Sequence, residues 1–159
     1  MKSILLFFLL SLSLPIYAQQ VTIFSPGVKV GYAFGERGGF IFGIELSLVF
    51  DPNTSDLENR YGAVISFETL KNEQRIHLGA QANLAAFRGD LWTYTGLEIG
   101  PTLLFNKGNV DFGLSVTPYF GGFIIPYYRL LITTNNLIQS EVGSFIKFHL
   151  PIKGKYTFS

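Results

Sequence analysis

Residues 40–50 read FIFGIELSLVF, and large apolar side chains occupy every even position of this stretch. The odd positions include Gly43, Glu45 and Ser47. Residues 28–35, VKVGYAFG, alternate in the same way. Successive side chains of a β-strand point to opposite faces, so both stretches predict strands with one apolar face and one small or polar face.

The N-terminal segment has the features of a secretory signal. Lys2 supplies a positive charge, residues 4–14 are mainly apolar, and Ala18 is a small residue suited to cleavage. The apolar stretch is short for a membrane anchor, which needs about 20 residues. We therefore expect a signal peptide at residues 1–18 and a mature domain at residues 19–159.

Composition excludes several classes of protein. The sequence has no cysteine, so it has no disulfide framework, cysteine nucleophile or cysteine metal site. The net charge of +1 provides no basic field for nucleic acid. After the signal, no apolar run approaches the 18 or so residues of a transmembrane helix.

Turn signals divide the mature chain into eight predicted strands. They cover approximately residues 28–35, 40–50, 61–70, 75–87, 91–105, 110–120, 123–133 and 137 to the end. The Ser25-Pro26-Gly27 sequence predicts a break before the first strand. Gly121-Gly122 predicts a hairpin, although parity alone would also allow one long bent strand there. A membrane barrel strand needs about 9–11 residues, which favours the hairpin. The predicted fold is an all-β, antiparallel up-and-down transmembrane β-barrel with eight strands.

A soluble barrel such as a lipocalin, which binds an apolar ligand, alternates in the same way with its faces reversed. Here the polar face is mostly small and uncharged, as a narrow lumen requires. Aromatic residues near strand ends predict the interfacial girdles of a membrane barrel. These girdle candidates are Phe34, Phe40, Phe50, Tyr61, Phe87, Trp92, Phe105, Tyr127 and Tyr128. We expect the outer membrane of a Gram-negative-type bacterium, and keep a soluble periplasmic barrel as an alternative.

In pattern, length and export signal, the mature chain resembles the small outer-membrane β-barrel family, of the OmpA-transmembrane-domain and OmpX type. The resemblance implies contact with membrane lipid, dependence on the outer-membrane insertion machinery, and no cofactor. Members usually end on an outward aromatic residue, whereas here Phe158 is followed by Ser159. Pro151 cannot donate a ladder hydrogen bond, so we expect a bulge or a strand end there.

The inward positions carry the polar candidates. They are Lys29, Glu45, Glu68, His77, Gln81, Asn83, Glu98, Asp111, Arg129, Lys147 and His149. An unpaired buried ion costs several kcal/mol, so charges of both signs in a narrow lumen should pair. We expect at least one carboxylate of Glu45, Glu68 and Glu98 to pair with Lys29, Arg129 or Lys147. This predicts a lumen plugged by ion pairs, with a narrow solute channel as the alternative.

Catalysis is less well supported by the sequence. A lipid A-modifying acyl hydrolase or transferase would need a nucleophile within reach of a histidine. His77 and His149 have no serine two positions away, and no base can be assigned to the inward-facing Ser66 or Ser115 from the sequence. Two distant histidines make no metal signature.

We therefore predict a structural or surface-interaction role carried by the loops, with no catalytic residue, metal or cofactor. The longest predicted loop is residues 51–60. Its length favours the cell exterior, whereas counting strands from a periplasmic N-terminus places it in the periplasm.

Overall fold

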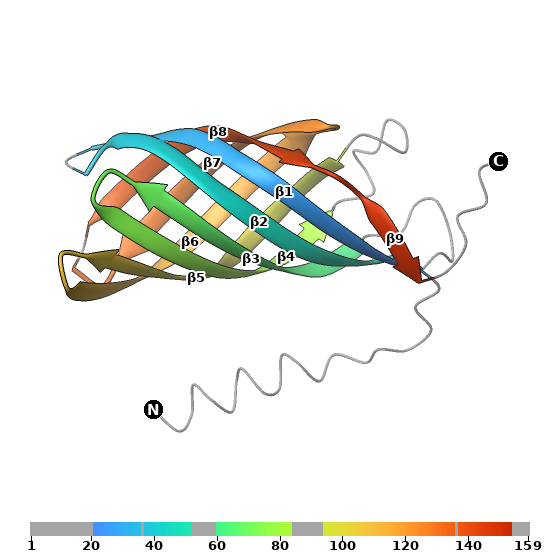
Figure 1. Cartoon of the computed structure of the whole chain (residues 1–159), viewed down its shortest axis with the longest axis horizontal. Helices are drawn as coiled ribbons and strands as arrows, with labels where there is room; N and C mark the ends of the chain where they lie inside the picture. Colours follow the sequence, from blue (N-terminus) through green and yellow to red (C-terminus); the bar gives the residue numbers. More distant parts are fainter. Residues whose placement is uncertain (1–20, 36, 52–59, 84–93, 136, 154–159) are drawn as a thin grey trace, which may run out of the picture.

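The computed structural model describes residues 21–35, 37–51, 60–83, 94–135 and 137–153 (Figure 1). These residues form nine strand segments. The segments are β1 (Val21–Phe34), β2 (Gly39–Asp51), β3 (Arg60–Leu70), β4 (Glu73–Asn83), β5 (Tyr94–Asn106), β6 (Asn109–Gly121), β7 (Ile124–Thr133), β8 (Ile138–Lys147) and β9 (Leu150–Lys153). Within this part of the chain, no helix is long and apolar enough to cross a membrane.

The strands close into a barrel. Each segment from β1 to β7 pairs antiparallel with the next, and β1 also pairs with β8 and β9. Because β8 and β9 both lie against β1, they are two parts of one strand interrupted at Phe148-His149. The molecule is thus an all-β, closed, eight-stranded antiparallel up-and-down barrel, as the sequence predicted.

The last strand contains the irregularity expected at Pro151. Ile23 of β1 pairs with Pro151, whereas the adjacent Thr22 pairs with Lys153. One extra residue is therefore inserted on β9, which is the definition of a β-bulge.

Two predicted boundaries differ from the structure. β1 runs without a break through Ser25-Pro26-Gly27, because β2 pairs with it along this whole length. Pro26 has no N–H, but its carbonyl oxygen accepts a hydrogen bond of 2.9 Å from the Phe148 amide. The hairpin after β6 is confirmed, with its two-residue loop at Gly122-Phe123, one position later than predicted.

The two ends of the barrel differ (Figure 1). The hairpin end carries the connections β1–β2, β3–β4, β5–β6 and β7–β8. Two of these are two-residue loops, Lys71-Asn72 and Lys107-Gly108, in which Lys71 and Lys107 have φ of 50° and 47°. At the opposite, terminal end β1 begins and β9 ends. Of the polar loop predicted at residues 51–60, Asp51 ends β2 and Arg60 begins β3, and residues 52–59 lie outside the described residues. The predicted signal peptide at 1–18 and the predicted strand residues 84–87, 91–93 and 154–159 also lie outside them.

The outward face of the barrel is apolar. Many of its large side chains are exposed, from 37% at Leu46 to 68% at Phe40, and others such as Ile65 are half-buried. Among strand residues whose side chains the structure describes, no charged residue points outward. The charged residues of these strands point into the lumen, and most are buried there. This is the reverse of the soluble barrel, in which the apolar face would point inward.

β4 and β5 come very close together near the middle of the barrel. A Cβ atom added to Gly100 would lie 1.9 Å from the carbonyl oxygen of Leu78 and 2.6 Å from the Cα atom of Gly79. Both contacts are with backbone, which cannot move aside as a side chain can.

We expect Gly100→Ala to lower the free energy of unfolding by about 1–3 kcal/mol or more, because an added methyl group overpacks this contact. Urea unfolding of the barrel refolded into lipid vesicles measures the effect. Gly113→Ala is the matched control, since its Cβ atom would meet the flexible Leu131 side chain at 2.8 Å and no backbone atom closer than the Ile132 oxygen at 3.0 Å. Equal losses in the two variants would contradict the close backbone approach at Gly100.

Candidate functional site

Glu68 on β3 lies at the centre of the charges inside the lumen. Its carboxylate accepts hydrogen bonds from Lys29 Nζ at 2.6 Å and from Ser66 Oγ at 2.8 Å. Arg129 Nη1 donates to both oxygens, at 2.7 and 2.9 Å. Lys29, on β1, and Arg129, on β7, are fully buried. Glu68 therefore joins three strands across the lumen.

A second group of charges extends towards the hairpin end. Arg75 on β4 donates to Glu73 at 2.6 Å, to Gln139 at 2.7 Å and to Glu141 on β8. Arg129 Nη1 lies 3.7 Å from Glu141 and connects this group to Glu68. Sequence reasoning missed these residues. Arg75 shares the inward parity of His77, and Glu141 that of Lys147, so the alternation itself could have identified them.

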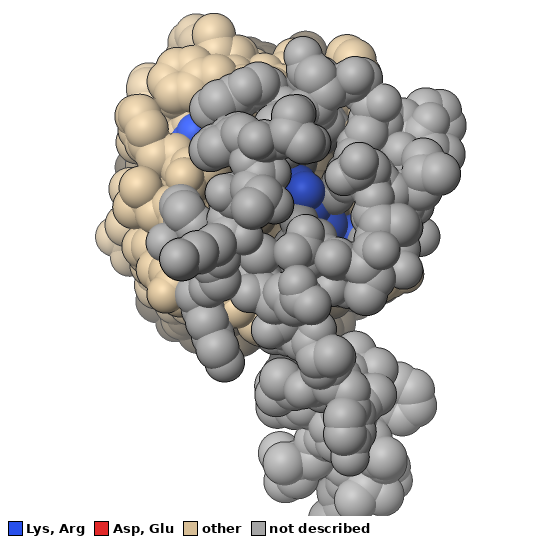
Figure 2. All heavy atoms as spheres, turned by 90° about the vertical axis from the view of Figure 1, so that its right-hand side faces the viewer, with Lys and Arg blue, Asp and Glu red and all other residues tan. Residues whose placement is uncertain are grey.

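A third group lies nearer the terminal end. Lys147 on β8 forms an ion pair with Glu45 on β2, and its Nζ lies 4.8 Å from the ring centroid of Phe145. Ser25 Oγ and His149 Nδ1 are 2.7 Å apart. Figure 2 views this end, and lysine or arginine atoms are visible inside the opening.

His77 and Ser115 form a contact that the sequence analysis did not expect. Ser115 Oγ and Thr102 Oγ1 each lie 3.0 Å from His77 Nδ1, while His77 Nε2 lies 2.8 Å from Glu98 Oε1. From the sequence no base could be assigned to Ser115, because only spacing along one strand was considered. In the structure Ser115, His77 and Glu98 lie on β6, β4 and β5, three successive strands of the sheet.

This order of hydroxyl, imidazole and carboxylate is the one used for nucleophilic catalysis. His77 and Ser115 are 0% exposed, however, and Glu98 is 1% exposed. A substrate could not reach the hydroxyl in this conformation. Arg129 Nη2 also lies 3.5 Å from Glu98, so the group is continuous with the charges around Glu68.

The remaining polar candidates also point inward. Asn83 accepts a hydrogen bond of 2.6 Å from the Tyr119 hydroxyl, and Gln81 is buried. Asp111 lies at the hairpin end, where its side chain is 11% exposed. Among the described residues, no group of three His, Cys, Asp or Glu residues could hold a metal ion.

The aromatic candidates divide into two groups. Phe34, Phe40, Tyr61 and Tyr128 are exposed on the outward face, and Phe50 and Phe105 are half-buried there. Phe87 and Trp92 lie outside the described residues.

Tyr127 was wrongly predicted to belong to the girdle. It is 5% exposed inside the lumen and stacks on Phe145, with ring centroids 4.6 Å apart. Its odd position on β7 points inward, and Gly143 makes room for it, since a Cβ atom there would lie 2.6 Å from the Tyr127 hydroxyl.

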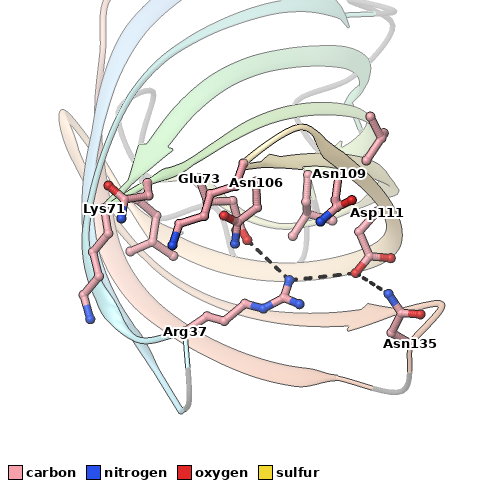
Figure 3. Close-up of a pocket in the computed structure, with 12 residues that line it drawn as sticks. Arg37, Lys71, Glu73, Asn106, Asn109, Asp111 and Asn135 are labelled. Atoms are coloured by element: carbon pink, nitrogen blue, oxygen red, sulfur yellow. Dashed lines mark hydrogen bonds and ion pairs between the residues drawn. The ribbon is translucent and has the colours of Figure 1, made fainter.

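The lumen opens at the hairpin end into a cavity of about 630 Å³. Arg37 lies between two carboxylates, with Nη1 3.5 Å from Glu73 and 3.8 Å from Asp111 (Figure 3). Asp111 also accepts hydrogen bonds of 2.9 Å from Thr134 and Asn135. We call this cavity the mouth. Its lining residues are Arg37, Leu70, Lys71, Asn72, Glu73, Leu104, Asn106, Lys107, Asn109, Val110, Asp111 and Asn135.

No protein-family model matches the chain, and no curated protein matches it. Among solved structures, the chain is similar to the crystal structure of Neisserial surface protein A. The two share 13% sequence identity with a TM-score of 0.52, and the likeness covers 79% of this chain and 95% of that one. At this identity the likeness supports the barrel fold and nothing more specific.

The Glu45–Lys147 pair offers a direct test of the lumen charges. We expect Glu45→Gln and Lys147→Met each to lower the free energy of unfolding, on the order of 3 kcal/mol, because each leaves a buried charge without its partner. The double variant should lose less than the sum of the two. Unfolding of the four proteins in lipid vesicles measures the coupling. Additive losses would indicate that the two charges are separately solvated, and would favour a channel over a filled lumen.

Proposed function

We propose that the mature chain is an outer-membrane β-barrel whose wall faces lipid. One observation carries this proposal: the described outward face bears no charge and exposes large apolar side chains all around the barrel. An apolar surface of this extent is not stable in water. The signal predicted at residues 1–18 would export the chain, and the outer-membrane insertion machinery would fold it into the membrane.

We further propose that the lumen is plugged and that the protein acts through the ends of the barrel. An eight-stranded barrel has an interior that side chains can fill. Here Glu68, Lys29 and Arg129 meet across it in buried ion pairs. A role in structure or in surface interaction fits this interior better than solute conduction. The sealed positions of His77 and Ser115 argue against an acyl hydrolase.

The lipid-facing wall can be tested by placing arginine at two depths on β6. Leu114 lies near the middle of this strand and Val110 lies near its hairpin end, and both are exposed. Arginine on the lipid face costs about 2–4 kcal/mol at mid-membrane and about 0–1 kcal/mol near the interface. We therefore expect Leu114→Arg to impair folding into lipid vesicles far more than Val110→Arg does. Leu46→Arg and Ile65→Arg should behave like Leu114→Arg. Equal folding of the Leu114 and Val110 variants would contradict the membrane proposal.

The orientation of the barrel in the membrane depends on the side on which its N-terminus lies. If the N-terminus of the mature barrel stays in the periplasm, the hairpin end faces the cell exterior. The chain has no cysteine, so single cysteines can report accessibility without background. We expect Asn72→Cys, at the hairpin end, to react with a membrane-impermeant maleimide on intact cells. Gly122→Cys, at the terminal end, should react only after the outer membrane is permeabilised. The opposite result would place the terminal end outside.

A further inference from the structure

We infer that the mouth at the hairpin end binds an acidic saccharide. Its volume of about 630 Å³ falls within the usual range for small-molecule sites. All four hairpin connections contribute to its lining, represented by Arg37, Asn72, Lys107 and Asn135. The site therefore exists because the barrel closes and brings four turns together.

Among the described lining residues, three basic side chains stand beside two carboxylates. Both of these carboxylates are already engaged within the protein. Glu73 binds Arg75 and Arg37, while Asp111 binds Thr134, Asn135 and the Phe112 amide. A ligand cation would have to compete with these contacts for the same oxygens.

The three basic residues of the mouth are less fully engaged. Lys71 and Lys107 form no ion pair with any described residue, and both are exposed. The Arg37 side chain is 38% exposed, and its contacts with the two carboxylates are long. A guanidinium has five N–H donors in a planar fork that suits a carboxylate or sulfate group. Arg37 thus retains donors for a ligand anion.

Amide and apolar groups extend the recognition beyond charge. The side chains of Asn72, Asn106 and Asn109 form no hydrogen bond with other described residues. Each amide offers donors and an acceptor, the combination that hydroxyl groups require. Leu70 and Leu104 are buried below them and provide an apolar floor. A ring with hydroxyl groups and an acidic substituent matches this lining better than a simple inorganic anion does.

An acidic peptide is a poorer match. Extended peptides commonly bind by adding a strand to an exposed sheet edge. This barrel has no such edge along β1 to β8, because every one of these strands pairs on both sides.

The biological source of the saccharide depends on the proposed function. If the hairpin end faces the cell exterior, the ligand is either the headgroup of a glycolipid in the same membrane or a free acidic glycan. The chemistry of the site is the same in both cases. Binding by the purified barrel in neutral detergent does not depend on membrane insertion or orientation, so it can fail or succeed independently of the proposed function.

The test titrates the refolded barrel with sialyllactose, lactose and inorganic sulfate, and follows binding by calorimetry. We expect sialyllactose to bind at least tenfold more tightly than lactose or sulfate. The double variant Lys71→Gln/Lys107→Gln should weaken sialyllactose binding by tenfold or more, a change of about 1.4 kcal/mol, because it removes two charged donors. Lys153→Gln, which removes one charge at the terminal end, is the control and should bind as the unsubstituted protein does.

A second variant tests recognition of the sugar hydroxyl groups separately from recognition of the charge. Asn106→Ala/Asn109→Ala should weaken sialyllactose binding while leaving sulfate binding unchanged. Circular dichroism and the heat-modifiable band in detergent would verify that both variants fold. A glycolipid with the same headgroup, in mixed micelles, distinguishes the source: preference for it over sialyllactose indicates the membrane headgroup, and equal affinity indicates the free glycan.

Unchanged sialyllactose binding in the lysine variant would overturn the inference. So would equal binding of lactose and sialyllactose, or tighter binding of an acidic peptide of the same charge.

Discussion

The pairing of β1 with both β2 and β8 is the constraint on which the rest of the structure depends. It closes the sheet, so the backbone groups of the strands are satisfied without an open edge. Closure also gives every strand residue one of two environments, because alternate side chains must point outward or inward. An apolar wall and a polar lumen are two consequences of this single geometry.

Confinement accounts for the arrangement of charges inside. A charged side chain that points inward cannot reach solvent through the wall, so it must find a partner among the few residues at the same level. Glu68 does so by accepting from Lys29 and Arg129, which approach it from other strands. Glycine positions contribute equally, since Gly143 and Gly100 provide the space that Tyr127 and the β4 backbone occupy. The lumen is filled by large charged residues placed beside small ones.

At the two ends of the barrel, closure constrains the side chains less than it does inside the lumen. Short connections bring polar side chains from four turns together at the hairpin end, where the mouth forms. The strands below hold these turn residues in position, but the charged side chains there need not all form ion pairs. Lys71 and Lys107 illustrate this difference from the buried Lys29, which binds Glu68. If the lumen is plugged as we propose, specific recognition is most easily placed in such a region.

The sequence by itself determined most of the strand positions and, through alternation, the face of most strand residues, with Tyr127 as an exception. Period-two alternation predicted the inward positions of Glu45, Glu98 and Lys147, and it would have predicted those of Arg75 and Glu141 had it been applied to every inward position. Alternation reports only on neighbours along one strand. It contains no information about which inward residues face each other, because that depends on strand register and on closure.

Tertiary structure alone therefore decided the partners: Ser115 beside His77, Glu45 with Lys147, and Arg37 between Glu73 and Asp111. It also decided that the β1 strand continues through Pro26. β2 pairs with Pro26 on one side, and on the other side Pro26 faces the interruption at Phe148-His149, where its carbonyl oxygen accepts from the Phe148 amide.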